Sequence, residues 1–492
     1  MIAILTRCLR YPALVSWLPL LLCVVATGLA RSQEPVTTFT DATKAAGLEI
    51  STDAACWVDL DNDGWVDLCA SGGVWKNNDG KTFTRVADVD TSIAADFDND
   101  GLVDLFSWNA RKLYRNQGEM KFAEFTLPEL PPSRSRGACW GDFNGDGFVD
   151  LFVGGYEDLD AGIAWPFQIL INEKGKSFKL IQSESYTRAR GITACDFDQD
   201  GDLDVYVSNY RLQPNLLWQN SGDKGFIDVA KEYDALGTSP GFGGGHTVGS
   251  AWGDFNSDGL FDLFVGNFAH VDGRGDQPKS RFLQNLGPDH QYHFKDLGTC
   301  GVHYQESYAT PSAGDYDNDG NLDVFFTTVY AGASFGRRNN PVLFRNNGQF
   351  EVTDVTAESG LADLPPTYQS AWADYNNDGA LDLVSAGKLF QNTGNGNSWL
   401  KVCLQGDGNK VNRAAVGAQV RITVGDNIYT RQVESGTGEG NQNDLTLHFG
   451  LGDHQGPVDV EITWPDQHHQ VVNDVTTGRV VTYTYEPAKQ PD

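Results

Sequence analysis

A nine-residue acidic motif that occurs seven times constrains this chain more than any other feature. The motif reads D-x-[DN]-x-D-G-x-x-D, and successive copies begin 37 to 61 residues apart, at Asp59, Asp96, Asp142, Asp196, Asp254, Asp315 and Asp374. Each copy is followed by a short apolar segment that ends in Asn. A period of this length indicates a repeat architecture, in which each unit buries its apolar face against its neighbours.

The residues around each motif predict β-structure. Apolar residues flank the last Asp of every copy, as Val66 and Leu68 flank Asp67, and this period of two predicts that each loop runs directly into a strand. The strand before the loop, the strand after it, the segment ending in Asn and a Phe-led segment such as 39–41 make about four strands per unit. We therefore predict an all-β fold, a seven-bladed β-propeller with calcium-binding loops plus a small C-terminal β-sandwich-like domain. An open β-solenoid is the alternative, but its repeats are usually shorter and more uniform.

The acidic loops have the composition of a calcium site. Carboxylates at positions 1, 3 and 5 converge when Gly at position 6 permits a sharp turn, position 7 offers its backbone carbonyl, and Asp at position 9 completes an all-oxygen shell. Such a shell suits Ca²⁺ better than Mg²⁺. An EF-hand is excluded, because position 12 is never Glu and the flanks read as strands. The predicted ligands are Asp59, Asp61, Asp63, Trp65 and Asp67 (loop 1); Asp96, Asp98, Asp100, Leu102 and Asp104 (loop 2); Asp142, Asn144, Asp146, Phe148 and Asp150 (loop 3); Asp196, Asp198, Asp200, Asp202 and Asp204 (loop 4); Asp254, Asn256, Asp258, Leu260 and Asp262 (loop 5); Asp315, Asp317, Asp319, Asn321 and Asp323 (loop 6); and Asp374, Asn376, Asp378, Ala380 and Asp382 (loop 7).

The charge of the chain agrees with this prediction. The net charge is -30, and positions 1, 3, 5 and 9 of the loops hold 25 of the acidic side chains. Without a cation each loop gathers like charges at short range, which costs stability. With a Kd of about 10⁻⁴ M and about 1 mM Ca²⁺, each site contributes roughly 1.4 kcal/mol, and seven sites about 10 kcal/mol. We therefore expect about seven calcium ions with a structural role.

The N-terminus has the features of an export signal. Arg7 and Arg10 precede an apolar run over residues 11–30, which ends in small residues. We expect a signal peptide over residues 1–30 and a secreted, periplasmic or cell-surface protein, with an uncleaved membrane anchor as the alternative. A pI near 4.5 argues against nucleic acid as a partner. The six cysteines after this segment permit disulfides but select no pairing, and small buried thiols are the alternative.

The repeat ends near Trp399, and a different β-rich segment follows. Residues 416–424, 427–433 and 458–464 read as strands joined by Gly-rich connections. We expect a propeller over residues 31–396, a small β-domain over 397–487 and a tail over 488–492.

The motifs resemble a known family. The seven loops with their strand flanks resemble the FG-GAP/VCBS repeats of integrin-α-type propellers. The segments 434–438, 447–452 and 464–465 are similar to the ASPIC/UnbV domain. The two in this order resemble the cartilage acidic protein family over about residues 39–485. The resemblance implies calcium in the loops and no established activity, since such propellers serve adhesion, ligand binding and a few lyases.

These observations favour a calcium-binding recognition or adhesion module that binds an extracellular glycan or protein, with no catalytic residues and no organic cofactor. The alternative is a polysaccharide lyase or hydrolase, for which His246, His270, His303 and Tyr304 are candidates if the fold gathers them with a cationic group. The tripeptide at 274–276, Arg-Gly-Asp, is more simply a product of a Gly- and Asp-rich composition than an integrin signal. Trp140, Trp252 and Trp372, just before their loops, are expected in the core.

Overall fold

The computed structural model describes residues 37–487 except 91–92, 185–186, 223–224 and 273–274. The predicted signal peptide therefore lies outside the described residues. The described chain consists of strands β1 to β39 and two single-turn 3₁₀ helices, η2 (Pro288–His290) and η3 (Ser334–Gly336). Within it, no helix is long and apolar enough to cross a bilayer.

Seven four-stranded antiparallel sheets, here called blades 1 to 7, each contain one acidic loop, and the predicted propeller is confirmed. In each blade the strand before the loop pairs with the strand after it, and a third and a fourth strand follow outward. From inner to outer edge the strands are β2 (Ala55–Val58), β3 (Asp67–Ala70), β4 (Gly73–Asn78) and β5 (Thr82–Ala87); β6 (Ile93–Ala95), β7 (Asp104–Ser107), β8 (Lys112–Asn116) and β9 (Phe122–Phe125); β10 (Ala138–Gly141), β11 (Asp150–Val153), β14 (Phe167–Asn172) and β15 (Phe178–Glu184); β16 (Ala189–Cys195), β17 (Asp204–Asn209), β18 (Leu216–Asn220) and β19 (Phe226–Asp228); β20 (Thr247–Gly253), β21 (Asp262–Asn267), β24 (Arg281–Asn285) and β25 (Phe294–Gly298); β26 (Tyr308–Gly314), β27 (Asp323–Thr328), β28 (Val342–Asn346) and β29 (Val352–Asp354); and β30 (Ser370–Ala373), β31 (Asp382–Ser385), β32 (Lys388–Asn392) and β1 (Phe39–Asp41).

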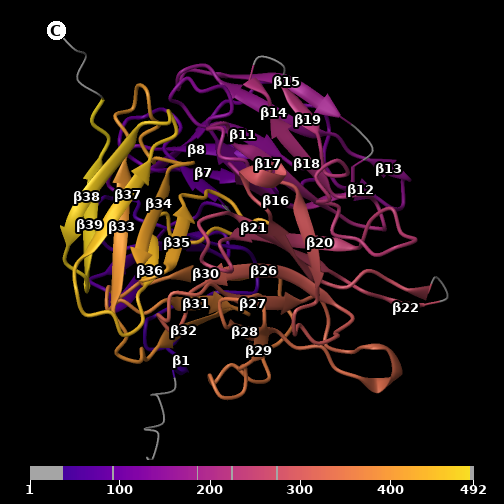
Figure 1. Cartoon of the computed structure of the whole chain (residues 1–492). Helices are drawn as coiled ribbons and strands as arrows, with labels where there is room; N and C mark the ends of the chain where they lie inside the picture. The colour runs from indigo at the N-terminus through magenta and orange to yellow at the C-terminus, as the bar shows by residue number, and fades with distance from the viewer. Residues whose placement is uncertain (1–36, 91–92, 185–186, 223–224, 273–274, 488–492) are drawn as a thin grey trace, which may run out of the picture. The chain divides into compact units, whose positions relative to one another are not determined.

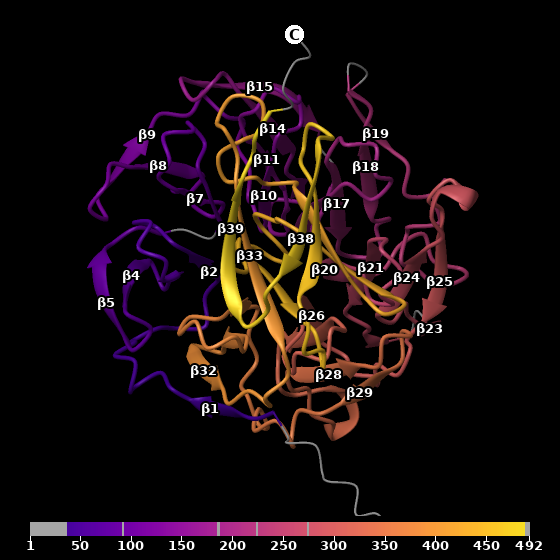
Figure 2. The same cartoon turned by 60° about the vertical axis from the view of Figure 1, so that its left-hand side comes forward.

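The inner strands form a closed ring. Strands β2, β6, β10, β16, β20, β26 and β30 each contact the next one, and β30 contacts β2. Figure 2 shows the blades following one another around this ring. The ring closes through β1, which pairs with β32 so that Phe39 lies opposite Asn392. The Phe-led segment of a repeat therefore forms the outer strand of the preceding blade and not the first strand of its own. Repeat and blade are offset by one strand. Blade 7 thus combines β1 from the start of the repeat region with three strands from its end.

The Asn at the end of each third strand, or one residue before it in β4, connects neighbouring blades. Its side-chain amide donates a hydrogen bond to the backbone carbonyl of loop position 2 in the preceding blade, as Asn116 does to Leu60 (2.9 Å). The bond from Asn77 to Tyr375 (2.8 Å) makes the same connection between blades 1 and 7. The other five are Asn172, Asn220, Asn285, Asn346 and Asn392. Because these amides are buried, an unpaired carbonyl here would cost about 1–3 kcal/mol, so the bonds fix the spacing of the blades.

Aromatic side chains fill the space between the blades. Trp140, Trp252 and Trp372 are at most 4% exposed, so the predicted core role is confirmed. The bulky residues at loop position 2 are buried too, as Phe197 is, stacked on Trp252 with ring centroids 6.3 Å apart.

The C-terminal part forms two further sheets, as Figure 1 shows in orange and yellow. Three of the strands match predicted segments, whereas β33, β36, β38 and β39 were missed. Strand β33 (Trp399–Gln405) pairs antiparallel with β36 (Leu447–Gly450) and parallel with β39 (Arg479–Thr484). The second sheet has the order β35 (Asn427–Gln432), β34 (Gln419–Val424), β37 (Val458–Thr463) and β38 (His469–Val475).

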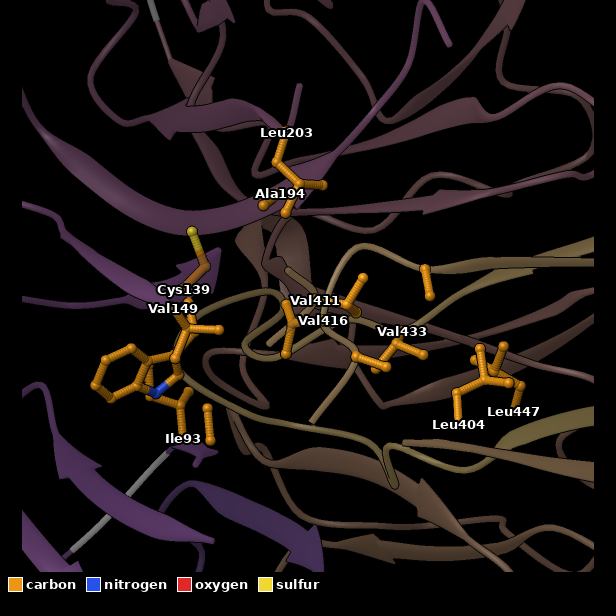
Figure 3. Packing of buried hydrophobic residues seen from close by; sticks show 14 of the residues in the cluster. Ile93, Cys139, Val149, Ala194, Leu203, Leu404, Val411, Val416, Val433 and Leu447 are labelled. Carbon is orange, nitrogen blue, oxygen red and sulfur yellow. The ribbon is translucent and has the colours of Figure 1, made fainter. Parts of the chain in front are cut away.

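One hydrophobic cluster unites these two sheets with blades 2 to 4. It contains Ile93, Cys139 and Leu203 from the blades together with Val416 and Leu447 from the C-terminal part (Figure 3). The two parts therefore share a core.

Two small hairpins extend from the blades. They are β12 (Glu157–Asp158) with β13 (Ile163–Ala164), and β22 (Val271–Asp272) with β23 (Gly275–Asp276). Strand β23 holds the last two residues of the Arg-Gly-Asp tripeptide, whose Arg274 lies outside the described residues.

The six described cysteines are all thiols, four of them buried.

Candidate functional site

The seven acidic loops share one backbone geometry. In loop 1 the carboxylate of Asp59 accepts the N–H groups of Asp63 (3.2 Å) and Gly64 (2.9 Å), and that of Asp63 accepts the N–H of Trp65 (3.0 Å). The same three bonds occur in loops 2 to 7. The glycine at position 6 has φ between 84° and 98°, which L side chains rarely adopt. The structure thus explains why position 6 is glycine and shows where the N–H of position 7 donates. That the carbonyl of position 7 is a calcium ligand stays a prediction.

The Asp at position 9 is fully buried in every loop. In loop 1 its two oxygens accept the N–H groups of Leu60 (3.0 Å) and Asn77 (2.8 Å), which ties the loop to the third strand. Five other loops repeat both bonds. In loop 4 only Oδ1 of Asp204 accepts such a bond, from Asn220, and Oδ2 is buried without a partner. Position 9 therefore holds the fold together in addition to facing the cluster.

The structure brings positions 1, 3 and 9 together in four loops. One oxygen from each residue lies within 4.8 Å of the others in the sets Asp59, Asp61 and Asp67; Asp96, Asp98 and Asp104; Asp196, Asp198 and Asp204; and Asp315, Asp317 and Asp323. These clusters have a geometry that can hold a metal ion. In loops 3, 5 and 7 position 3 is Asn, and the amides of Asn256 and Asn376 donate to the position-5 carboxylate of their own loop.

The side chains at loop position 3 show best whether the acidic loops suit a bound cation. Oδ1 is buried and lacks a hydrogen-bond partner in Asp61, Asp98, Asp198, Asn256 and Asp317. A buried oxygen without a donor is costly, and a cation removes that cost. In Asp98 and Asp198 the other oxygen is engaged by the third strand, through Arg115 (2.6 Å) and Gln219 (2.6 Å). The donor set is all oxygen and suits a hard cation.

Burial and mutual repulsion raise the pKa values of these carboxyl groups. Burial is the main cause for Asp96 and Asp196, whose pKa values rise to about 7, and neighbouring loop carboxylates add to it. The pKa of Asp104 rises to about 9 for the same reasons. At neutral pH the loops therefore favour a bound proton or a bound cation over bare carboxylates.

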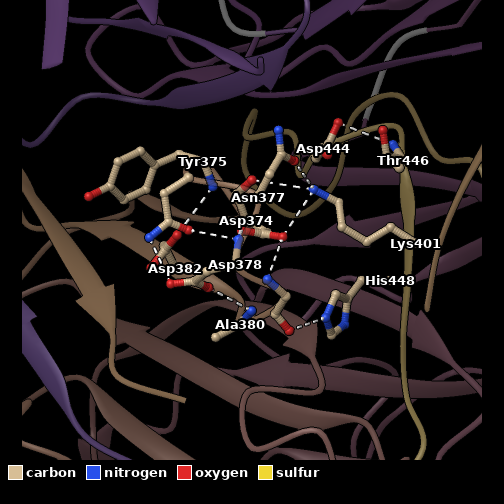
Figure 4. A network of polar contacts seen from close by, with 12 residues as sticks. Asp374, Tyr375, Asn377, Asp378, Ala380, Asp382, Lys401, Asp444, Thr446 and His448 are labelled. Carbon is tan, nitrogen blue, oxygen red and sulfur yellow. Dashed lines mark hydrogen bonds and ion pairs between the residues drawn. The ribbon is translucent and has the colours of Figure 1, made fainter. Parts of the chain in front are cut away.

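The C-terminal sheets contact the propeller on the face that carries the acidic loops, here called the loop face. The N–H of Gly450 donates to Asp315 (3.1 Å), and the N–H of Thr430 donates to Asp254 (3.2 Å). Figure 4 shows Lys401 reaching loop 7, where its ammonium group pairs with Asp374 (3.2 Å) and donates to Asn377 (3.0 Å). The C-terminal part thus supplies donors and a cation to the loops that sequence reasoning treated as independent.

Residues 435–444, here called the insertion segment, enter the ring of inner strands and turn back within it, with Thr437 and Asn441 paired antiparallel. The backbone of Gln442 exchanges hydrogen bonds with β2, and the carbonyls of Ser435 and Gly438 accept N–H groups from β10 and β16. At its tip, Glu439 pairs with Arg190 on β16 (2.7 Å), both side chains being buried. The segment includes part of the predicted ASPIC/UnbV motif, but no signal in the sequence indicated where it would lie.

The far face is the opposite end of the inner strands. Here the structure brings His246 and His270 together with Arg188, Tyr210 and Arg211 around a cavity of about 480 Å³. The other two enzyme candidates do not line this cavity: His303 is half exposed and pairs with Asp354, and the hydroxyl of Tyr304 donates to the carbonyl of Ala269. Sequence reasoning missed Arg188, Tyr210 and Arg211, because they belong to no repeat.

Comparison with known families divides the chain in the same way as the structure does, into the propeller and the C-terminal part. Residues 96–153, 196–265 and 315–385 match the FG-GAP-like repeat, and residues 408–490 match the family described as ASPIC and UnbV. This chain is an FG-GAP-repeat protein with a C-terminal ASPIC and UnbV domain. The family resemblance expected from the sequence is confirmed.

Curated relatives of this FG-GAP-repeat protein include cartilage acidic protein 1. The Xenopus tropicalis protein is 31% identical over 297 residues, which cover 57% of this chain and 42% of the relative. The Homo sapiens protein is 28% identical over 305 residues, which cover 60% and 43%. The matched region thus spans less than half the length of these relatives.

The matches among solved structures are more distant. BBS1N in complex with ARL6DN aligns with a TM-score of 0.40 and 11% identity, covering 72% of this chain and 96% of that one. The exotype rhamnogalacturonan lyase YesX aligns with a TM-score of 0.35 and 13% identity, covering 89% and 77%.

Proposed function

We propose that this chain is an exported recognition module, whose propeller is stabilised by calcium in the acidic loops and which binds an extracellular glycan or protein. The observation that carries the calcium part is the buried, unpartnered oxygen at loop position 3, next to two further carboxylates. Protein ligands that are all oxygen and irregularly placed favour Ca²⁺.

In this proposal the carboxylate and amide oxygens of positions 1, 3, 5 and 9 hold the ion, together with the carbonyl of position 7. The role is structural, since the C-terminal sheets lie over the loops and donate to Asp254 and Asp315. Export is inferred from the charged and apolar N-terminal segment. The name of the curated relatives supports an extracellular setting.

Calcium dependence is tested by urea unfolding of the secreted protein in 1 mM calcium and in chelator. We expect a loss of about 10 kcal/mol or unfolding on chelation, since about seven sites contribute roughly 1.4 kcal/mol each. Asp198→Ala removes one ligand set and leaves the others, whereas Asp289→Ala changes an exposed acidic side chain. Only Asp198→Ala should reduce the number of bound calcium ions. Equal stability with and without calcium would exclude the proposal.

A polysaccharide lyase or hydrolase is the second candidate, and one observation favours it. The far face gathers two histidines, a tyrosine and two arginines around one cavity, the residue types that uronate elimination needs. Incubation of the protein with a panel of polysaccharides, followed by chromatography of the products, separates the two candidates. Cleavage would identify an enzyme, and binding without cleavage a recognition module.

A further inference from the structure

The cavity on the far face, here called the arginine pocket, is built from four separate turns. Arg188 precedes β16, Tyr210 and Arg211 follow β17, and His246 precedes β20. His270 follows β21 and completes the lining. None of these residues belongs to the acidic repeat, so the lining is specific to blades 4 and 5.

A buried carboxylate fixes the two arginines. Glu157 on β12 is 6% exposed, and its two oxygens pair with Arg188 (2.6 Å) and Arg211 (2.7 Å). One carboxylate thus faces two guanidinium groups, and a second buried carboxylate, that of Glu306, lies 3.9 Å from Nδ1 of His270. A guanidinium held in place by one carboxylate keeps further N–H donors for an anionic ligand.

The backbone around the pocket is built to present these side chains. Arg211 and Leu212 have φ of 61° and 60°, a conformation that few L residues adopt, and two in succession mark a strained turn. Opposite this turn, a Cβ on Gly244 would lie 1.8 Å from the carbonyl oxygen of Gln213. The glycine run at 243–245 therefore lets the chain pass this turn and deliver His246 into the pocket.

Rings and hydroxyl groups complete the lining. The rings of Tyr210 and His246 meet edge to face at 4.8 Å, and those of His246 and His270 at 4.9 Å. The hydroxyl of Tyr210 lies 3.3 Å from Nε2 of His270. Burial raises the pKa of Tyr210 to about 12, so the phenol stays protonated at neutral pH and serves as a hydrogen-bond donor.

We propose that the arginine pocket binds a carboxylate-bearing sugar, a uronate residue of an acidic polysaccharide. Arg188 and Arg211 face the carboxylate, while Tyr210, His246 and His270 offer ring surfaces and polar groups to the sugar ring. A cavity of about 480 Å³ falls within the range of small-ligand sites. Ring surfaces at fixed angles favour a rigid sugar over an acidic peptide. This inference rests on the proposed recognition function and names its ligand class.

The test is calorimetric titration of the secreted protein, in 1 mM calcium, with tetragalacturonate, with its methyl ester and with tetraglutamate. Of the three compounds, we expect only tetragalacturonate to bind. Arg211→Gln should bind tetragalacturonate at least 10-fold more weakly than the parent protein does. Arg211→Lys keeps the charge but loses the planar fork, so we expect a smaller loss. Arg479→Gln changes an exposed arginine on β39 and should leave binding unchanged.

Two results would overturn the assignment. Equal binding of the methyl ester shows that the carboxylate is not recognised, and preferential binding of tetraglutamate makes the ligand a peptide. Cleavage of tetragalacturonate that is lost in Arg211→Gln would support the ligand class but replace recognition by catalysis. The unfolding experiment in chelator tests the calcium-held fold separately, so a failure there is distinguishable from a failure here.

Discussion

On the loop face every blade repeats the same nine-residue motif and nearly the same hydrogen bonds, whereas on the far face neighbouring blades contribute different side chains to one cavity. The loop face is contacted by the C-terminal sheets, which donate to Asp254 and Asp315. The arginine pocket lies at the other end of the same inner strands. The difference supports the proposal that the repeated residues stabilise the ring and that residues outside the repeat recognise the ligand.

If the insertion segment joins the two faces, breaking its tip should have the largest effect. Glu439→Ala leaves the buried guanidinium of Arg190 without its carboxylate partner. We expect a loss of about 3–5 kcal/mol in the free energy of unfolding, measured in urea. The control is Glu124→Ala, which removes an exposed ion pair with Lys112 and should cost at most about 1 kcal/mol. Equal losses in the two variants would mean that the segment does not stabilise the ring.

The connections between blades on the loop face should come next. Asn346→Ala removes the donor to the carbonyls of Phe255 and Leu322. We expect a loss of about 2–3 kcal/mol, because both carbonyls stay buried. Asn473→Ala, on the exposed part of β38, is the matched control and should change stability by less than about 0.5 kcal/mol. A loss in Asn346→Ala as small as in the control would contradict the role given to the third-strand Asn.

A smaller effect with a pH signature is expected where the insertion segment begins. Glu434 is partly buried and lines a cavity of about 110 Å³, and burial raises its pKa from the ordinary 4.5 to about 8. Between these pH values the folded state keeps a proton that the unfolded state releases, so this group lowers stability as pH rises through the window. Glu434→Gln removes that dependence and should stabilise the protein by about 2 kcal/mol at pH 8, less than the full pKa difference implies, because the cavity can hold water.

Unfolding free energies in urea at pH 5 and pH 8 check this prediction. The gain in Glu434→Gln should be near zero at pH 5 and largest at pH 8. Glu358→Gln, an exposed position, should show the same free energies as the parent at both pH values. A gain that is independent of pH would assign the effect to packing instead of ionisation.

The smallest effect on stability is expected on the far face. Arg211→Gln leaves Arg188 to neutralise Glu157 and removes a side chain that is 42% exposed. We expect a change of about 0.5 kcal/mol or less in urea, although the same variant should lose ligand binding. A loss of several kcal/mol would make Arg211 a structural residue and would weaken the distinction between the two faces.

Much of the fold follows from local pattern. Position 6 needs glycine because of its φ, and the alternation around Asp67 places the next strand, so both are visible in one repeat. The candidate ligands at positions 1, 3 and 9 are predictable for the same reason. The pairing of β1 with β32 is not predictable from local pattern. It depends on which end of the repeat region pairs with the free edge of β32 in blade 7. The predicted β-domain missed β39, whose parallel partner β33 lies far away in sequence.

The sequence by itself determined the acidic loops and the number of blades, because both rest on interactions within about nine residues that recur seven times. It indicated the family through these loops together with the C-terminal motifs. The tertiary structure alone decided that residues 435–444 enter the ring and that Arg188, Arg211, His246 and His270 meet in one pocket. These residues come from different blades, and nothing local links them. Their proximity is produced by closure of the ring, which is a property of the whole chain.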